Sequence, residues 1–214
     1  MEIFEEIAIG VEKGDSESVA ALIKKALSLK VPAEKILNNG LVSGMDRIGR
    51  RFKNNEVFIP EVLVSARAMK AGTEMLKPLL IQAKAKSKGK VVMGTVKGDL
   101  HDIGKNLVSM MLEGAGYEVI DLGPDVAKEK FLEVIEKEKP DILGMSALLT
   151  TTMIYMKEVI KALEEANLKS KIKVIIGGAP ITQSYAEAIK ADGYAPDAAS
   201  GVDLANDLLQ KNKA

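Results

Sequence analysis

Hydrophobic positions change their spacing near residue 90, and this change divides the chain in two. Up to about Ala85, apolar residues recur three or four positions apart, as they do on one face of a helix. Asp15 or Ser16 is suited to cap the second helix, and Pro32 and Pro60 suit the first turns of the third and fourth. Short polar breaks separate four such stretches, at residues 3–11, 19–27, 36–48 and 62–76. The spacing therefore predicts a small bundle of four helices.

After Lys90 the runs become short, rich in β-branched residues and bounded by Gly or Asp: "KVVMGTV", "YEVIDLG", "DILGMSA" and "KVIIGGA". Amphipathic helical stretches separate them, an alternation that predicts a parallel sheet covered on both faces. A fifth short strand is expected near "GYAPDA", before a last helix over "VDLANDLLQK". The predicted fold class is thus α + α/β: a helical bundle (1–85), a linker (86–89) and a Rossmann-like, flavodoxin-like domain with a five-stranded parallel sheet (90–214).

Composition excludes several kinds of site. The chain has no cysteine, so it cannot form disulfides, thiolate zinc sites or iron–sulfur clusters. Thirty basic residues balance thirty acidic ones, so no overall field favours nucleic acid or an anionic membrane. The N-terminus lacks an apolar run of signal length and no eighteen apolar residues occur together, so we expect a cytoplasmic protein without a membrane span.

All four arginines, Arg47, Arg50, Arg51 and Arg67, lie in the helical half. A solvated helix face held by salt bridges would explain them. Guanidinium groups also suit the pairing of carboxylates and phosphates, so a docking surface for a partner or contacts to an anionic ligand are the alternatives.

The segment "GTVKGDLHDIG", residues 94–104, follows the first predicted strand and holds the only histidine, His101. Loops at the carboxyl ends of parallel strands commonly bind ligands. The segment matches neither the phosphate-binding loop G-x-x-x-x-G-K-[ST] nor the dinucleotide motif G-x-G-x-x-G. A receiver domain using Asp99, Asp102 and Ser146 is disfavoured, because "IIGGAP" stands where that fold would carry a lysine and the acidic pair is not at the strand tip.

A loop histidine is ordinarily a solvent-facing residue, but Asp99 lies two positions before His101. Metal-ligating histidines commonly donate their second ring N–H to a carboxylate, which fixes the tautomer. One imidazole cannot hold zinc alone, and no thiolate is available to complete a site. A metal already caged in a macrocycle, such as haem or a corrin, needs only one such ligand.

Three elements carry a family resemblance. "DLHDIG" resembles the Asp-x-His-x-x-Gly motif of cobalamin-binding domains, and it is followed by "SAL" after 41 residues and by Gly177-Gly178 after a further 28. The stretch "GLVSGMDRIGRRFKNNEVFIPEVLVSARAMKAG" resembles the helical cap of cobalamin-dependent methionine synthases and of the corrinoid proteins of methyltransferase systems. The chain as a whole is most similar to the corrinoid proteins of corrinoid-dependent methyltransferase systems.

The resemblance implies a role for each matching residue. His101 would be the axial ligand of cobalt on the lower face, Asp99 would accept the hydrogen of its ring nitrogen, and Ser146 would extend that hydrogen-bond chain. Residues expected around the cofactor tail are Gly104, Leu148, Thr150, Gly177, Gly178, Gly193 and Tyr194. On the upper face the resemblance points to Phe52, Ile59 and Val62, whose alternative is ordinary bundle core.

The implied cofactor is cobalamin or a related corrinoid, carried as methylcobalamin when its cobalt accepts a methyl group as methyl-Co(III). A substrate-specific methyltransferase would load the methyl group from a donor such as methanol, methylamine, betaine or a methoxyaromatic compound. A second methyltransferase would pass it to tetrahydrofolate or a thiol coenzyme, and a reductive activase would restore the cofactor. No catalytic residue is expected, so the chain would be a carrier subunit with Arg47, Arg50 and Arg51 as candidate partner contacts.

Three rival functions use the same pocket. A cobalamin-dependent sensor or regulator should carry an output domain, and the N-terminal half has no basic recognition helix. A cobalamin-binding subunit of a mutase would lack the cap resembled by "FKNNEVFIPEV". A pocket that has lost its cofactor is disfavoured because all three motif elements are intact.

Overall fold

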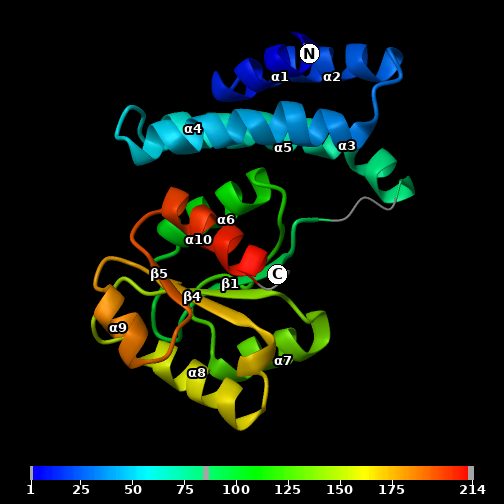
Figure 1. Cartoon of the computed structure of the whole chain (residues 1–214). Coiled ribbons are helices and arrows are strands. Elements are labelled where there is room, and N and C mark those ends of the chain that lie inside the picture. The colour runs from blue at the N-terminus through cyan, green and yellow to red at the C-terminus, as the bar shows by residue number, and fades with distance from the viewer. Residues whose placement is uncertain (1, 84–86, 212–214) are drawn as a thin grey trace. The chain divides into compact units, whose positions relative to one another are not determined.

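The protein is described by a computed structural model covering residues 2–83 and 87–211 (Figure 1). The chain divides into two compact units between Ser87 and Lys88, with Glu113–Gly116 grouped with the first. Residue 86 of the predicted linker 86–89 lies outside the described residues, and the predicted domain bounds stay a prediction.

The first unit is helical, as predicted. Asp15 caps its second helix by accepting a hydrogen bond from the backbone N–H of Ser18 at 3.0 Å. The last helix starts at Ile59 with Pro60 in its first turn. The helices are α1 (Glu2–Glu12), α2 (Ser16–Ser28), α3 (Ala33–Ile36), a π-helical segment η1 (Leu37–Val42), α4 (Ser43–Lys53) and α5 (Ile59–Gln82). Neighbours α1, α2, α4 and α5 pack against one another around an aliphatic core.

The third predicted helix differs from expectation in its middle. It continues from Ala33 to Lys53, but η1 inserts a wider turn into it. A Cβ on Gly40, within this turn, would lie 2.9 Å from Cγ2 of Ile7, so the helix packs tightly on α1. Its buried residues Ile36 and Leu41 stand five positions apart, a spacing that fits a π turn better than an α turn.

The second unit is built on a five-stranded sheet, and all of its strand pairs are parallel. Its strands are β1 (Lys90–Thr95), β2 (Glu118–Asp121), β3 (Ile142–Ser146), β4 (Lys173–Gly177) and β5 (Gly193–Ala195). Their order is β2-β1-β3-β4-β5, so the direction of winding reverses beside β1. The predicted parallel sheet of five strands is therefore confirmed.

Helices cover both faces of this sheet (Figure 1). They are α6 (Ile103–Gly114), α7 (Lys128–Glu138), α8 (Ile154–Glu165), the 3-10 turn η2 (Lys169–Lys171), α9 (Gln183–Ala188) and α10 (Ala198–Lys211). Figure 1 shows α6 and α10 on one face and α7, α8 and α9 on the other. Alternate strand residues such as Val92, Leu143 and Val174 pack in one core with α7, α8 and α9. Within residues 2–83 and 87–211, no helix is both long and apolar enough to cross a membrane.

Candidate cofactor site

Two loops meet at the carboxyl edge of the sheet. One follows β1 and contains His101; the other follows β3 and starts with Ala147. The register pairs Thr95 with Ser146, so both loops leave the sheet from adjacent strands. The first loop leads into α6 and the second into α8, which lie on opposite faces (Figure 1). This is the switch point at which open parallel sheets bind ligands.

The side chain of Asp99 connects the two loops through hydrogen bonds. Its carboxylate is fully buried, and Oδ1 accepts hydrogen bonds from the backbone N–H of His101 at 3.0 Å and from the imidazole Nδ1 at 2.8 Å. Its other oxygen, Oδ2, accepts from the hydroxyl of Thr152 at 2.6 Å and from the backbone N–H groups of Leu148 and Leu149 at 2.7 and 3.3 Å. Burial alone would raise the pKa of Asp99, but these hydrogen bonds, that of Thr152 first, together hold it well below its usual range.

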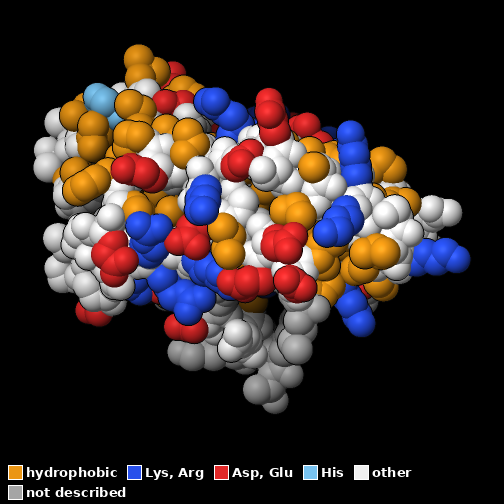
Figure 2. Space-filling view, turned by 90° about the horizontal axis from the view of Figure 1, so that it is seen from above, with side chains coloured by type: hydrophobic (Ala, Val, Ile, Leu, Met, Phe, Trp, Pro, Cys, Tyr) orange, Lys and Arg blue, Asp and Glu red, His pale blue; other side chains and the backbone are white. Residues whose placement is uncertain are grey.

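An ionised Asp99 decides which nitrogen of His101 carries the proton. A carboxylate accepts hydrogen bonds but cannot donate them, so Nδ1 must be the donor. In the neutral imidazole Nε2 then keeps its lone pair and can serve as a ligand. The imidazole is about half exposed, at 52%, and His101 is the one pale-blue side chain at the surface in Figure 2.

The two loops also carry exposed apolar side chains. Leu100 and Ile103 are 72% and 76% exposed, on either side of His101. The loop after β3 and the start of α8 add further exposed apolar side chains, from Leu148, Leu149 and Ile154. We call these five residues the apolar rim. Exposed apolar surface of this extent beside polar groups is typical of a binding surface.

Three glycines lie at the same edge: Gly177 and Gly178 allow close backbone approach, and Gly104 borders open space. Gly178 has a φ of +129°, and a Cβ there would overlap the carbonyl oxygen of Ala147. A Cβ on Gly177 would lie 3.0 Å from the carbonyl oxygen of Ala195. A Cβ on Gly104, at the start of α6, would meet no atom within 4 Å. Only glycine therefore fits at 178, whereas Gly104 borders open space.

Other predicted pocket residues are placed differently. A Cβ on Gly193 would lie 2.6 Å from the Leu204 side chain, so this glycine allows packing of α10 rather than space at the carboxyl edge. Tyr194 is half-buried and packs against the core with α7, α8 and α9. Thr150 is exposed in the loop after β3, beside the rim.

Ser146 was expected to extend the hydrogen-bond chain of Asp99 and His101, but Thr152 and not Ser146 donates to Asp99. The hydroxyl of Ser146 lies 2.7 Å from that of Thr95, which donates to the backbone carbonyl of His101 at 3.3 Å. It thus reaches the main chain of His101 and not the carboxylate of Asp99. The hydroxyl on Asp99 belongs to Thr152, which sequence reasoning missed because three threonines follow one another at 150–152.

In the helical unit, the predicted upper-face residues divide by burial. Phe52 is half-buried at the end of α4, and Ile59 is exposed at the start of α5. Val62 is fully buried, so its side chain has no surface to offer a cofactor and the alternative, core packing, describes it. Next to Ile59, Phe58 is also exposed and was not predicted.

Two arginines of the helical unit are held in ion pairs. Both terminal nitrogens of Arg47 donate to Glu5, at 2.7 and 2.6 Å, and this pairing holds the pKa of Glu5 below its usual value. Arg51 donates to Glu12 at 2.8 Å. For these two residues the salt-bridged helix face is what the structure shows.

The residues of the second unit fit a corrinoid. One oriented imidazole offers a single free nitrogen, apolar side chains flank it, and glycine at 178 lets two loops approach closely. In the part of the chain that the structure describes, no group of three or more His, Asp or Glu side chains could hold a bare metal ion. A metal already held in a macrocycle would need only one further ligand, and the imidazole of His101 could provide it.

Comparison with known proteins agrees with this fit. Residues 89–203 match a family model described as a B12 binding domain, and residues 3–77 match a second model of that description. A corrinoid protein of Desulfitobacterium hafniense is 44% identical over 214 residues, which is 99% of both chains. A dimethylamine corrinoid protein of Methanosarcina acetivorans is 44% identical over 97% of this chain and 98% of its own.

A solved structure extends the likeness to the fold. The methanol:cobalamin methyltransferase complex MtaBC of Methanosarcina barkeri contains a chain with a TM-score of 0.87 and 34% identity. The match covers 98% of this chain and 80% of that one. The fold and cofactor class expected from the three motif elements are thereby confirmed. The chain belongs to the family of B12-binding corrinoid proteins.

Proposed function

We propose that this protein is a methyl carrier, a corrinoid subunit that receives a methyl group from one methyltransferase and delivers it to another. The observation that carries the proposal is the oriented imidazole of His101, whose Nδ1 is held by ionised Asp99 so that Nε2 is left as a ligand. The names of the relatives, dimethylamine and trimethylamine corrinoid proteins, support the methyl-transfer role.

The bound corrinoid would supply a cobalt able to take up and release a methyl group. The chain's own residues bind and orient it. His101 would hold the cobalt through Nε2, while Asp99 keeps the proton on Nδ1 and fixes the direction of the ring. Thr152 and the backbone N–H of Leu148 hold Asp99 in turn. The apolar rim would pack against the macrocycle and exclude water from it.

The tail of the corrinoid requires room at the same edge of the sheet. We assign this room to Gly104, beside which the space is open, with Thr150 and Ser146 as neighbours. Gly177 and Gly178 would shape the edge next to it, since they let the backbones of Ala195 and Ala147 approach closely. Gly193 and Tyr194 are retained only as supports of the sheet behind the pocket. Phe52 and Ile59 remain our candidates for upper-face contacts, since both have accessible surface.

The proposed partners are those of a carrier. One methyltransferase would load a methyl group from a small donor, of the kind that the relatives' names record as dimethylamine, trimethylamine or methanol. A second would move it to tetrahydrofolate or a thiol coenzyme, and a reductive activase would recover oxidised cofactor. Because Arg47 and Arg51 are held by glutamates, Arg50 is the better candidate for partner contact.

Axial ligation is tested by reconstituting the protein with hydroxocobalamin and reducing it to the cobalt(II) state. We expect electron paramagnetic resonance to show hyperfine coupling to one axial nitrogen. Because the chain has a single histidine, labelling histidine with ¹⁵N must change that pattern if His101 is the ligand. If labelling leaves the hyperfine pattern unchanged, the cofactor's own base and not His101 is bound to cobalt. If the protein binds no corrinoid at all, the proposal is wrong.

His101→Ala provides the matched variant. It should lose the histidine-dependent coupling and shift the absorption spectrum toward that of the corrinoid without a protein ligand. A variant spectrum identical to that of the wild type would show that His101 is not the ligand. The carrier role is tested separately, by following a labelled methyl group from dimethylamine or methanol onto the loaded protein in the presence of a cognate methyltransferase.

A further inference from the structure

Two buried charges of opposite sign stand at the ends of a short exposed segment. Asp99 is fully buried and Lys105 is 2% exposed. Between them lie residues 100–104, which we call the ligand arch. Three of its side chains, those of Leu100, His101 and Ile103, are each more than half exposed. The arch is therefore anchored at both ends by groups that cannot easily leave the interior without an unpaired charge.

Lys105 occupies an unfavourable place for a cation. It lies in the first turn of α6, where the partial charge of a helix is positive, and its ammonium group has no exposed surface. Both oxygens of Asp121, at the end of β2, accept from Nζ at 2.5 Å, and Oδ1 of Asn106 accepts at 2.6 Å. These contacts compensate the buried charge and tie the start of α6 to β2.

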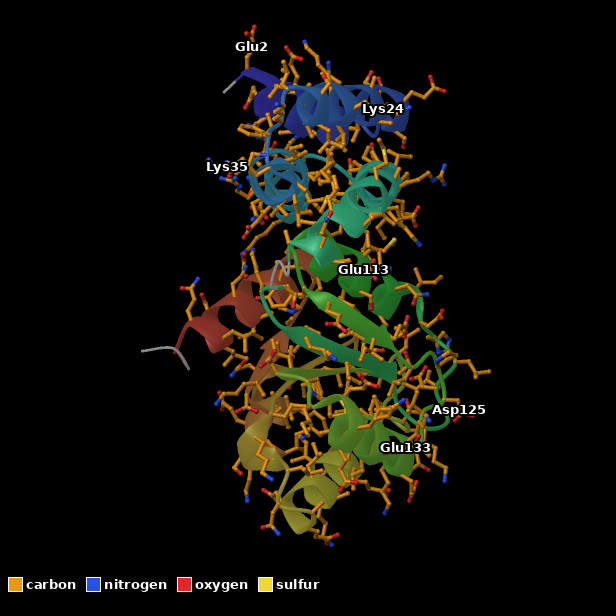
Figure 3. All side chains as sticks on the ribbon, turned by 90° about the vertical axis from the view of Figure 1, so that its right-hand side faces the viewer. Glu2, Lys24, Lys35, Glu113, Asp125 and Glu133 are labelled. Atoms are coloured by element: carbon orange, nitrogen blue, oxygen red, sulfur yellow. The ribbon has the colours of Figure 1, made fainter. Side chains whose placement is uncertain are left out.

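Asp121 continues the connection into the β2–α7 loop, residues 122–127. Its Oδ1 accepts from the backbone N–H of Gly123 at 2.8 Å, which orders the turn that follows. Asp125, labelled in Figure 3 in this loop, then accepts from the backbone N–H of Gly98 at 2.7 Å. Its own N–H donates to the carbonyl oxygen of Asp99 at 3.0 Å. The loop thus links the anchor at Lys105 to the anchor at Asp99.

We propose that Lys105 is a positioning residue for the cobalt ligand: through Asp121 it fixes the far end of the ligand arch and the β2–α7 loop, and so sets where His101 presents its Nε2. The inference rests on the proposed role of His101 as the axial ligand. It adds a second determinant of ligation to Asp99, one that does not touch the imidazole.

The test compares three variants. Lys105→Met and Asp121→Asn each remove the charge pair with a side chain of similar size. Lys169→Met is the matched control, since Lys169 donates to Asp192 at 2.6 Å beside the start of β5, at the opposite edge of the sheet. Circular dichroism and urea unfolding establish that each variant is folded; if Lys105→Met is not, Asp121→Asn decides the question alone.

Two measurements separate positioning from general stability. In the cofactor-free proteins, amide hydrogen exchange should accelerate about tenfold or more in peptides covering 97–104 and 122–126 for Lys105→Met and Asp121→Asn, but not for Lys169→Met. After reconstitution with hydroxocobalamin, the same two variants should bind roughly ten times more weakly, as outer partners of metal ligands commonly do on mutation. Their cobalt(II) signal should also lose part of the histidine coupling.

The outcomes distinguish this inference from the proposed function. If wild type shows no histidine coupling, the proposed ligand fails and the inference with it. If wild type shows it and Lys105→Met and Asp121→Asn retain it fully, with unchanged affinity, the positioning role alone is wrong. Equal loss of coupling in Lys169→Met would assign the effect to general destabilisation and overturn the inference as well.

Discussion

The two edges of the sheet distribute charge in opposite ways. At the amino edge, ion pairs such as Lys169 with Asp192 are partly exposed, and apolar neighbours such as Ile142 and Ile172 are buried. At the carboxyl edge the charged groups of Asp99 and Lys105 are buried, although Asp121, the partner of Lys105, is 39% exposed, and the apolar rim is exposed. An edge built only for stability would follow the first arrangement, because apolar burial stabilises and charge burial does not. This difference supports our assignment of the proposed cofactor site to the carboxyl edge.

The comparison is sharpest at Asp99 itself. Asp99→Ala leaves several buried donors without an acceptor, so the free energy of unfolding of the cofactor-free protein should fall by about 3 kcal/mol. Urea unfolding measures this change. Asp192→Ala, at the amino edge, removes the acceptor of Lys169 and of the Val174 N–H and should cost less than half as much. Equal losses would show that the two edges are not energetically different.

Thr152→Val tests which hydroxyl holds the carboxylate. Valine nearly preserves the shape of threonine but cannot donate to Asp99, so stability should fall by about 1.5 kcal/mol, the usual worth of a hydrogen bond to a charged group. Ser146→Ala removes a neutral hydrogen bond with Thr95 and should cost less. Urea unfolding of both variants gives the order, and the reverse order would return Ser146 to the role expected from its motif.

Lys169→Met probes the amino edge. The ion pair with Asp192 is partly exposed, so its loss should cost about 1 kcal/mol or less, and the difference should shrink as salt is added. Thermal and urea unfolding at low and high ionic strength measure it. Hydroxocobalamin affinity should not change; a weakened affinity would mean that the amino edge also contributes to the site.

Gly104→Ala has the smallest expected effect on stability and the opposite sign. Alanine favours the helix start and meets no atom, so the cofactor-free protein should gain about 0.5 kcal/mol. If the open space belongs to the corrinoid, the added methyl group should weaken hydroxocobalamin binding about tenfold, as overpacking of a contact does. Gain of stability with unchanged affinity would show that no part of the cofactor packs there.

Local patterns predicted most of the fold. Hydrophobic spacing located the four helical stretches and the strands, and Asp15 and Pro60 marked helix starts, because caps and first turns depend on neighbouring residues alone. The π turn was missed, although the five-residue step from Ile36 to Leu41 was its signal. A search for the α-helical period of 3.6 residues does not recognise a five-residue step.

Contacts between distant residues could not be predicted in the same way. Arg47 and Arg51 pair with Glu5 and Glu12, about forty positions away, and nothing local distinguishes such a pair from two free side chains. The motif found Asp99 and His101 because they are two residues apart. The contact of Thr152 with Asp99 could not be predicted from the sequence, because it depends on the conformation of the loop after β3.

The hydrogen bonds of Asp99 also bear on the order in which the protein folds. Leu148 and Thr152 lie 49 and 53 residues further along the chain, in a loop that leads into the opposite helical layer. Contacts between residues this far apart in the sequence form later than local ones, and these join the loops that follow the paired strands β1 and β3. We therefore expect the carboxylate of Asp99 to be held in its final position only after the loops that follow β1 and β3 have come together. Corrinoid capture that depends on this geometry would discriminate finished molecules from partly folded ones.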